Sequence, residues 1–150
     1  MKGFDAIKNF KIAIFFLCSI SMVVGILVYA LIKPSEAIAI KYFINRSPLL
    51  EIRSILTSYE YPEWVLYNLS DFLWAYSYSI FIFGVWIGSK TIESLIWIST
   101  IPILTFGYEI CQYWNFIPGT FDFLDLTFIF IGVTSSLLTI IILRRVFKIE

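Results

Sequence analysis

The stretch GYEICQYWNFIPGTFDFLDL, Gly107–Leu126, joins two long apolar segments through a short polar turn. Residues three apart on a helix share a face, so Glu109 and Gln112 point the same way before the turn. Asp122 and Asp125 have the same spacing after it. The Pro-Gly pair between them suits a tight reversal of the chain. The stretch therefore predicts two antiparallel helices that bring their polar side chains together.

The apolar segments around this turn are two of four predicted membrane spans. A helix needs about 20 mainly apolar residues to cross a bilayer core. Segments of roughly this length lie at Ile12–Ile32, Phe72–Ser89, Ser94–Trp114 and Asp122–Leu143. Short connections follow the second and third segments, which makes antiparallel neighbours. We predict an all-α integral membrane four-helix bundle, with residues 1–150 as a single membrane domain.

The composition agrees with lipid as the main solvent and excludes several classes of protein. Charged residues make up 15% of the 150 residues, against roughly 25% in soluble domains. Lysine plus arginine equals aspartate plus glutamate, so the chain lacks the basic surplus of a nucleic-acid binder. The absence of histidine excludes Ser-His-Asp and Cys-His catalysis and any His-ligated metal site.

The connection between the first two spans is long enough to form structure of its own. It runs over Lys33–Ser70 and mixes apolar with charged residues. A helix beginning after Pro48 would place Leu49, Ile52 and Leu56 on one face. Such an amphipathic outer segment would lie on the membrane surface or pack over the outer end of the bundle.

Basic residues near the span ends predict the orientation of the bundle. They form three groups, at the N-terminus, in the second connection and at the C-terminus: Lys2, Lys8 and Lys11, then Lys90, then Arg144, Arg145 and Lys148. The long first connection also carries Lys33, Lys41, Arg46 and Arg53, but spreads them among four glutamates. Four spans place all three groups on one side, which should be the cytoplasm. The turn at Asn115–Phe121 has no basic residue and is predicted outside. We therefore expect a multi-pass membrane protein with both termini in the cytoplasm.

Polar side chains from three predicted spans reach one level of the membrane. Asn68 and Asp71, three residues apart, lie at the start of the second span. From the helical rise, Glu109 lies roughly 22 Å from the inner end of its span, and Asp71 and Asp125 each roughly 27 Å. All are near the outer third of the bilayer. The candidate ligand-binding residues are Glu109, Gln112, Asp122, Asp125, Asn68 and Asp71.

A carboxylate inside a span is by default a candidate for function, because inserting it into the membrane at the helix centre costs at least about 2.5 kcal/mol. Acids at close range also repel, so one of them should hold its proton or a cation or arginine should lie among them. Structural interpretations remain open for some of them. Asp122 and Asp125 suit the N-terminus of the fourth helix as a cap or dipole partner. Asn68 and Asp71 suit the membrane interface.

These residues resemble the motifs of the VanZ-like family of small bacterial membrane proteins. That family shows E-x-x-Q late in one span, a short outer turn, D-x-x-D at the start of the next span and a downstream glycine. The matching residues here are Glu109 and Gln112, Pro118–Thr120, Asp122 and Asp125, and Gly132. The segment LSDFLWAYS, Leu69–Ser77, is similar to the polar start of the preceding family span, although the chain lacks the arginine often found before the first aspartate. The resemblance implies the inner (cytoplasmic) membrane of the bacterial envelope and an association with glycopeptide (teicoplanin) resistance.

Three functions use the same acids and remain open. The first is binding of a cationic or amide-rich ligand, a lipid headgroup or a partner in an acidic outer cleft. The second is an enzyme acting on a lipid-linked substrate, with a carboxylate as general acid or base. A divalent cation on Glu109, Asp122 and Asp125 would also fit the enzyme, because oxygen ligands suit Mg²⁺. The third is proton- or cation-coupled transport.

Overall fold

A computed structural model describes residues 2–32, 49–117 and 121–149, and in these ranges the regular structure is entirely helical. The helices are α1 (Lys2–Leu31), α3 (Leu49–Leu56), α4 (Glu63–Tyr67), α5 (Leu69–Trp86), α6 (Ile92–Tyr113) and α7 (Phe123–Val146). The all-α prediction is confirmed. Pro48, after which the sequence predicts the start of the amphipathic helix, lies outside the described residues.

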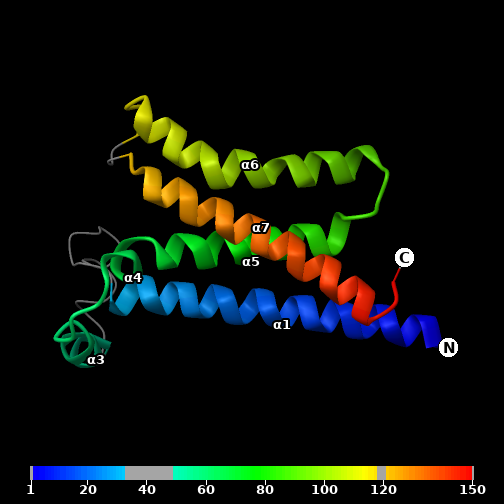
Figure 1. Cartoon of the computed structure of the whole chain (residues 1–150), viewed down its shortest axis with the longest axis horizontal. Helices are drawn as coiled ribbons and strands as arrows, with labels where there is room; N and C mark the ends of the chain where they lie inside the picture. The colour runs from blue at the N-terminus through cyan, green and yellow to red at the C-terminus, as the bar shows by residue number, and fades with distance from the viewer. Residues whose placement is uncertain (1, 33–48, 118–120, 150) are drawn as a thin grey trace.

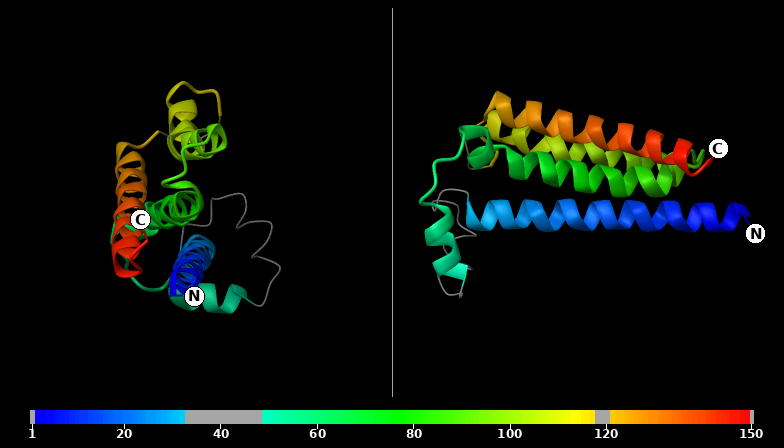
Figure 2. Two further views of the ribbon diagram at one scale, coloured as in Figure 1. Left: turned by 90° about the vertical axis from the view of Figure 1, so that its right-hand side faces the viewer. Right: turned by 60° about the horizontal axis from the view of Figure 1, so that its bottom comes forward.

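The four long helices run back and forth along one axis, with α5 between α1 and α7 (Figures 1 and 2). Helix α6 packs on α5 and α7 but makes fewer contacts than the other three. Both termini lie at the same end as the connection between α5 and α6 (Figure 1). The opposite end carries α3, α4 and the connection between α6 and α7. We call these the terminal end and the acidic end.

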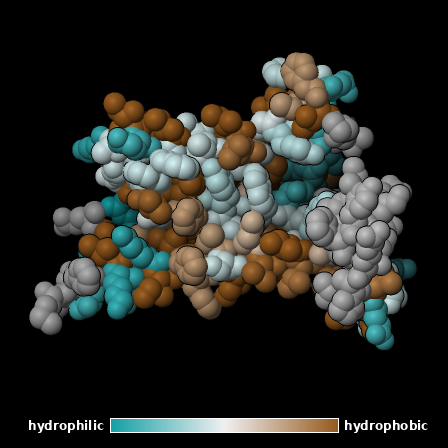
Figure 3. Space-filling view, turned by 180° about the vertical axis from the view of Figure 1, so that it is seen from behind, coloured by the Kyte–Doolittle hydropathy of each residue, from teal (hydrophilic) through white to brown (hydrophobic). Residues whose placement is uncertain are grey.

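Among the described residues, three helices are long and apolar enough to cross a membrane: Asp5–Leu31, Ile92–Tyr113 and Phe123–Val146. They correspond to the first, third and fourth predicted spans and indicate a membrane protein. The second predicted span, Phe72–Ser89, is not among them, because the serines and tyrosines among the 18 residues of α5 lower its hydropathy. The surface agrees with a membrane setting, since hydrophilic groups gather towards both ends and apolar or weakly polar groups cover the middle (Figure 3).

Helices α5 and α7 approach closely because small residues line their contact. A Cβ atom placed on Gly132 would lie 2.7 Å from the carbonyl oxygen of Phe72. Ala75, Ser79 and Ser136 are fully buried in the same pair of helices. Small residues allow this approach where lipid gives no hydrophobic drive between helices. The terminal end adds an apolar cluster from α1, α5 and α7, made of Phe10, Ile14, Ile80 and Ile140.

Helix α6 ends in a hydrogen-bonded reversal that directs the chain towards α7. Asn115 has a positive φ of 56°, which asparagine tolerates better than most residues. The N–H of Phe116 donates to the carbonyl of Cys111 (2.9 Å), and the N–H of Asn115 donates to that of Gln112 (2.9 Å). These two bonds define a Schellman motif, which satisfies carbonyls left unpaired at a helix end.

Helix α3 lies crosswise at the end of α1 (Figure 2). Its Arg53 is buried, with 7% of its surface exposed, and its guanidinium Nη1 donates to the carbonyl of Ala30 (2.6 Å). A cation at a helix C-terminus satisfies a free carbonyl and opposes the negative end of the helix dipole. The outer segment is therefore attached to the bundle by a buried cation.

Candidate functional site

Three helix ends bring four carboxylates to the acidic end of the bundle. Asp71 lies in the first turn of α5, and Glu109 lies about one turn before the end of α6. Asp122 is the N-cap of α7, and Asp125 lies in its first turn. The spacing in the sequence predicts this gathering, because each acid is close to a chain reversal.

Glu109 is at the centre of this cluster. Only 6% of its surface is exposed, and its Oε2 is buried without a hydrogen-bond partner in the described part of the chain. Asp125, Asp71 and Asp122 all lie close enough to act on its charge, Asp125 most strongly. The backbone amide of Asp122 is within hydrogen-bonding reach of the carboxylate. The side chains whose charges act on Glu109 in the described ranges are therefore all acidic.

A buried amide links two of the helices that form the cluster. Asn68 lies at the junction of α4 and α5 with 2% of its surface exposed. Its Nδ2 donates to Oδ1 of Asp125 on α7 (2.5 Å). A hydrogen bond to a charged acceptor is stronger than one between neutral groups. Asn68 thus holds the start of α5 against the start of α7, and orients one carboxylate beside Glu109.

Two of the predicted residues take structural positions. The side chain of Asp122 is exposed and accepts from the N–H of Leu124 (2.8 Å), so it caps α7 as the alternative interpretation expected. Gln112 is half-buried on the last turn of α6 and makes no side-chain hydrogen bond within the described residues. The structure therefore groups Asn68, Asp71, Glu109 and Asp125 closely, places Asp122 at the rim, and does not link Gln112 to them.

The acids do not form a metal site in the ranges that the structure describes. No group of three acidic or cysteine side chains there is arranged to hold a metal ion. The carboxylate of Asp122 accepts from the N–H of Leu124 in the first turn of its own helix. A divalent cation on these three residues stays a prediction.

A second polar feature of the acidic end could not be found from sequence spacing. An open pocket of about 680 Å³ lies beside the end of α1. Its lining residues are Ile32, Arg53, Thr57, Tyr59, Glu60, Tyr61 and Leu66. The sequence assigns Arg53 only to an outer segment, since its acceptor on Ala30 lies 23 residues away and no local pattern joins the two.

No family model, curated protein or solved structure matches the chain. The resemblance to the VanZ-like family therefore stays a prediction. Function has to be argued from the geometry and chemistry of the acidic cluster, because a helical bundle by itself implies no activity.

Proposed function

We propose that the protein is a VanZ-like, four-pass protein of the bacterial inner membrane that binds a cationic ligand at its acidic end. The observation that carries the binding proposal is the buried Oε2 of Glu109, which has no hydrogen-bond partner in the described chain and lies among other acids. A buried charge without a partner is costly, so such sites are usually paired with a cation. The ligand would supply a positive charge at Oε2 of Glu109.

The four-pass topology is supported by the position of α5. It lies between α1 and α7, and its polar residues Ser70, Ser77 and Ser79 are buried against them rather than turned to the outside. A helix enclosed by others needs less hydrophobicity than one that faces lipid. Its 18 residues span roughly 27 Å, close to the thickness of a bilayer core.

The proposed orientation follows from the charges at the two ends. The terminal end carries Lys8, Lys11, Lys90 and the basic residues in and just after the last turn of α7, and cytoplasmic faces are rich in such residues. The acidic end would then face outwards, at the level of the outer leaflet. A ligand would reach it from the outside of the cell or from the outer leaflet. A link with glycopeptide resistance rests on the family resemblance alone.

An ammonium group fits this cluster better than a metal ion does. An ammonium offers three N–H donors and accepts looser geometry than a divalent cation, which needs several oxygens at fixed distances. The described acids lack a metal-ligating arrangement. Binding also has more support than transport, because the described acids near Glu109 are confined to one end and do not continue along the bundle. The alternative function, an enzyme that uses a divalent cation, would be favoured if only divalent cations bind in the following experiment.

The test compares wild-type protein with Glu109→Gln and with Glu93→Gln, purified in a neutral detergent. Glu93 is a matched control, because it is an exposed acid on the same helix at the terminal end. Thermal unfolding is followed while ethanolamine, spermidine, Mg²⁺, Ca²⁺ or Mn²⁺ is added. We expect the amines to raise the melting temperature of the wild type and of Glu93→Gln, but not of Glu109→Gln.

Two other results would reject ligand binding through an ammonium group. If divalent cations alone raise the melting temperature, and Glu109→Gln abolishes this rise, the metal-dependent enzyme would be favoured. No response to any cation, together with higher stability of Glu109→Gln, would mean that the cluster is structural and that its acids simply repel.

A further inference from the structure

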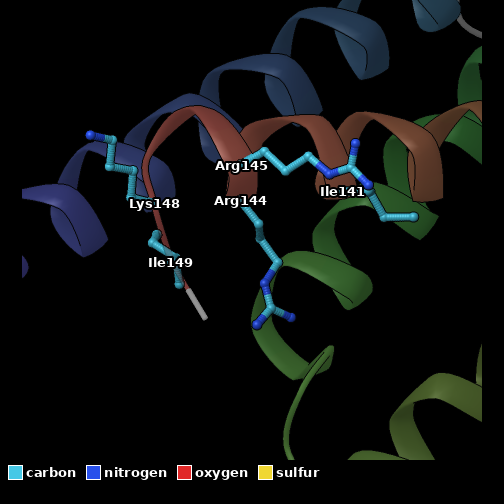
Figure 4. A pocket seen from close by; sticks show the side chains of 5 residues that line it. All are labelled: Ile141, Arg144, Arg145, Lys148 and Ile149. Carbon is cyan, nitrogen blue, oxygen red and sulfur yellow. The ribbon is translucent and has the colours of Figure 1, made fainter.

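The terminal end carries an open pocket, and three of its five lining side chains are cationic (Figure 4). Its volume is about 460 Å³, within the range of about 300–1,000 Å³ of sites that bind small molecules and headgroups. The lining residues are Ile141, Arg144, Arg145, Lys148 and Ile149. Three cations thus lie within five consecutive residues, and none of the described residues that line the pocket is acidic.

A Schellman motif at the end of α7 creates this arrangement. The N–H of Ile149 donates to the carbonyl of Arg144 (2.9 Å), and the N–H of Lys148 donates to that of Arg145 (3.2 Å). Lys148 occupies the left-handed position of the motif, with φ of 54°. Glycine or asparagine usually takes that position. Lysine there turns the chain back and adds a third cation beside the two arginines.

The segment that carries the cations packs against the neighbouring helices α1 and α5. Phe147 packs edge-on against Phe10 of α1, with ring centroids 6.4 Å apart. Nη1 of Arg144 approaches the carbonyl of Ile87 at the end of α5 (3.5 Å) and lies close to Gly88, where a Cβ atom would be only 2.9 Å away. Arg144 is therefore half-buried against the end of α5, while Arg145 and Lys148 are exposed.

Figure 4 shows how the pocket combines charge with apolar surface. The side chain of Arg144 extends towards α5, that of Arg145 runs back along α7 towards Ile141, and Lys148 lies beyond the helix end. Exposed apolar residues continue along α7 above the pocket, with Leu138 54% exposed and Ile142 59% exposed. A molecule with an anionic head and an apolar tail would contact both parts.

The depth of the pocket matches the level of lipid headgroups. Asp125 at the acidic end and Arg144 are separated by 18 residues without a charge, which corresponds to roughly 29 Å along the helix. A bilayer core is about 30 Å thick, so Arg144 lies at the interface when the acids lie at the opposite one. Basic pockets between helices at this level bind anionic headgroups, and guanidinium groups pair with phosphate in a bidentate manner.

We propose that this pocket binds the phosphate-bearing headgroup of an anionic membrane phospholipid, with an acyl chain along the exposed face of α7. The site is separate from the acidic cluster and does not depend on its ligand. In the proposed orientation it faces the cytoplasmic leaflet.

The test uses the double variant Arg145→Gln/Lys148→Asn, which removes two cations and keeps a residue that tolerates the left-handed backbone at 148. The matched control is Lys8→Gln/Lys11→Gln, because both lysines are exposed on α1 towards the terminal end and neither lines the pocket. Each protein, purified in a zwitterionic detergent, is titrated with phosphatidylglycerol, with phosphatidylcholine of the same chains, and with inorganic phosphate. Native mass spectrometry counts bound lipid, and the melting temperature reports stabilisation.

We expect the wild type and the control to retain phosphatidylglycerol in preference to phosphatidylcholine. Loss of a cation near the membrane surface should weaken binding about fivefold, and loss of both about thirtyfold. Arg145→Gln alone should give the smaller of these losses, which keeps the test valid if the double variant folds poorly. Equal loss in the lysine control, equal retention of phosphatidylcholine, or equal stabilisation by inorganic phosphate would overturn the proposal.

Discussion

Two glycines in the middle of long helices have opposite surroundings, and this difference predicts opposite effects of adding a methyl group. A Cβ atom on Gly132 of α7 would lie 2.7 Å from the carbonyl oxygen of Phe72 and 3.2 Å from the backbone nitrogen of Tyr76. A Cβ atom on Gly107 of α6 would meet nothing within 4 Å. Because the atoms near Gly132 belong to backbone, they cannot rotate away, and α5 and α7 would have to move apart.

Alanine gains about 0.8–1.0 kcal/mol of helix propensity over glycine in water, and this gain should be similar at the two positions. The steric cost exists only at Gly132, where forcing an extra methyl into a packed contact typically costs about 1–3 kcal/mol. Gly132→Ala should therefore have a free energy of unfolding about 1–3 kcal/mol lower than Gly107→Ala. Comparison of the two variants removes the common propensity gain.

The assay is reversible unfolding of the purified protein in mixed micelles with increasing dodecyl sulfate, followed by helical circular dichroism. Gly107→Ala is expected to be as stable as the wild type or slightly more stable. If Gly132→Ala is as stable as Gly107→Ala or more stable, the inference that α5 and α7 pack closely at Gly132 is wrong. The position of α5 between α1 and α7, on which the fourth crossing depends, would then lose its support.

Further changes test the acidic end and its attachments. Asn68→Ala removes the amide that donates to the α7 carboxylate and should lower the free energy of unfolding by about 1–3 kcal/mol in the same assay; no change would mean that this hydrogen bond does not join α5 to α7. Arg53→Met removes the buried cation at the Ala30 carbonyl and should speed proteolysis within α3, whereas Glu51→Gln on the exposed face should not. Asn115→Gly should retain or raise thermal stability, while Asn115→Val should lower the free energy of unfolding by about 1–2 kcal/mol because a β-branched residue resists positive φ; the reverse order would exclude the Schellman motif at the end of α6.

Hydrophobicity predicts where the long helices lie better than where they end. The first predicted span begins at Ile12, but α1 begins at Lys2, because three lysines in its first turns interrupt the apolar run without interrupting the helix. The fourth predicted span ends at Leu143, but α7 continues through Val146. In both cases charged residues continue a helix beyond its apolar part, which is expected where a helix leaves the hydrocarbon core.

The gathering of acids could be predicted because it depends only on spacing and on chain reversal. The partners within the cluster could not. Asn68 and Asp125 are 57 residues apart, and only the packing of α5 against α7 selects this pair. The spacing also gives Asp122 and Asp125 equal weight, whereas the helix start turns Asp122 to its own backbone and leaves Asp125 for Asn68. The sequence does not predict the pocket lined by Arg144, Arg145 and Lys148 either, because a lysine gives no indication of the left-handed conformation that Lys148 adopts.

The zero net charge of the chain hides a strong separation of charge along its length. Helix α7 carries Asp125 at one end and Arg144 at the other with no charge between them. Asp125 accepts a hydrogen bond from Asn68 and lies beside the buried Glu109. Arg144 donates to the carbonyl of Ile87 at the end of α5. Helix α7 therefore carries an anionic group near one end and cationic groups near the other. The two proposed ligands, a cation at the acidic end and an anionic lipid at the terminal end, follow from this polarity, and each is tested by variants that leave the opposite end unchanged.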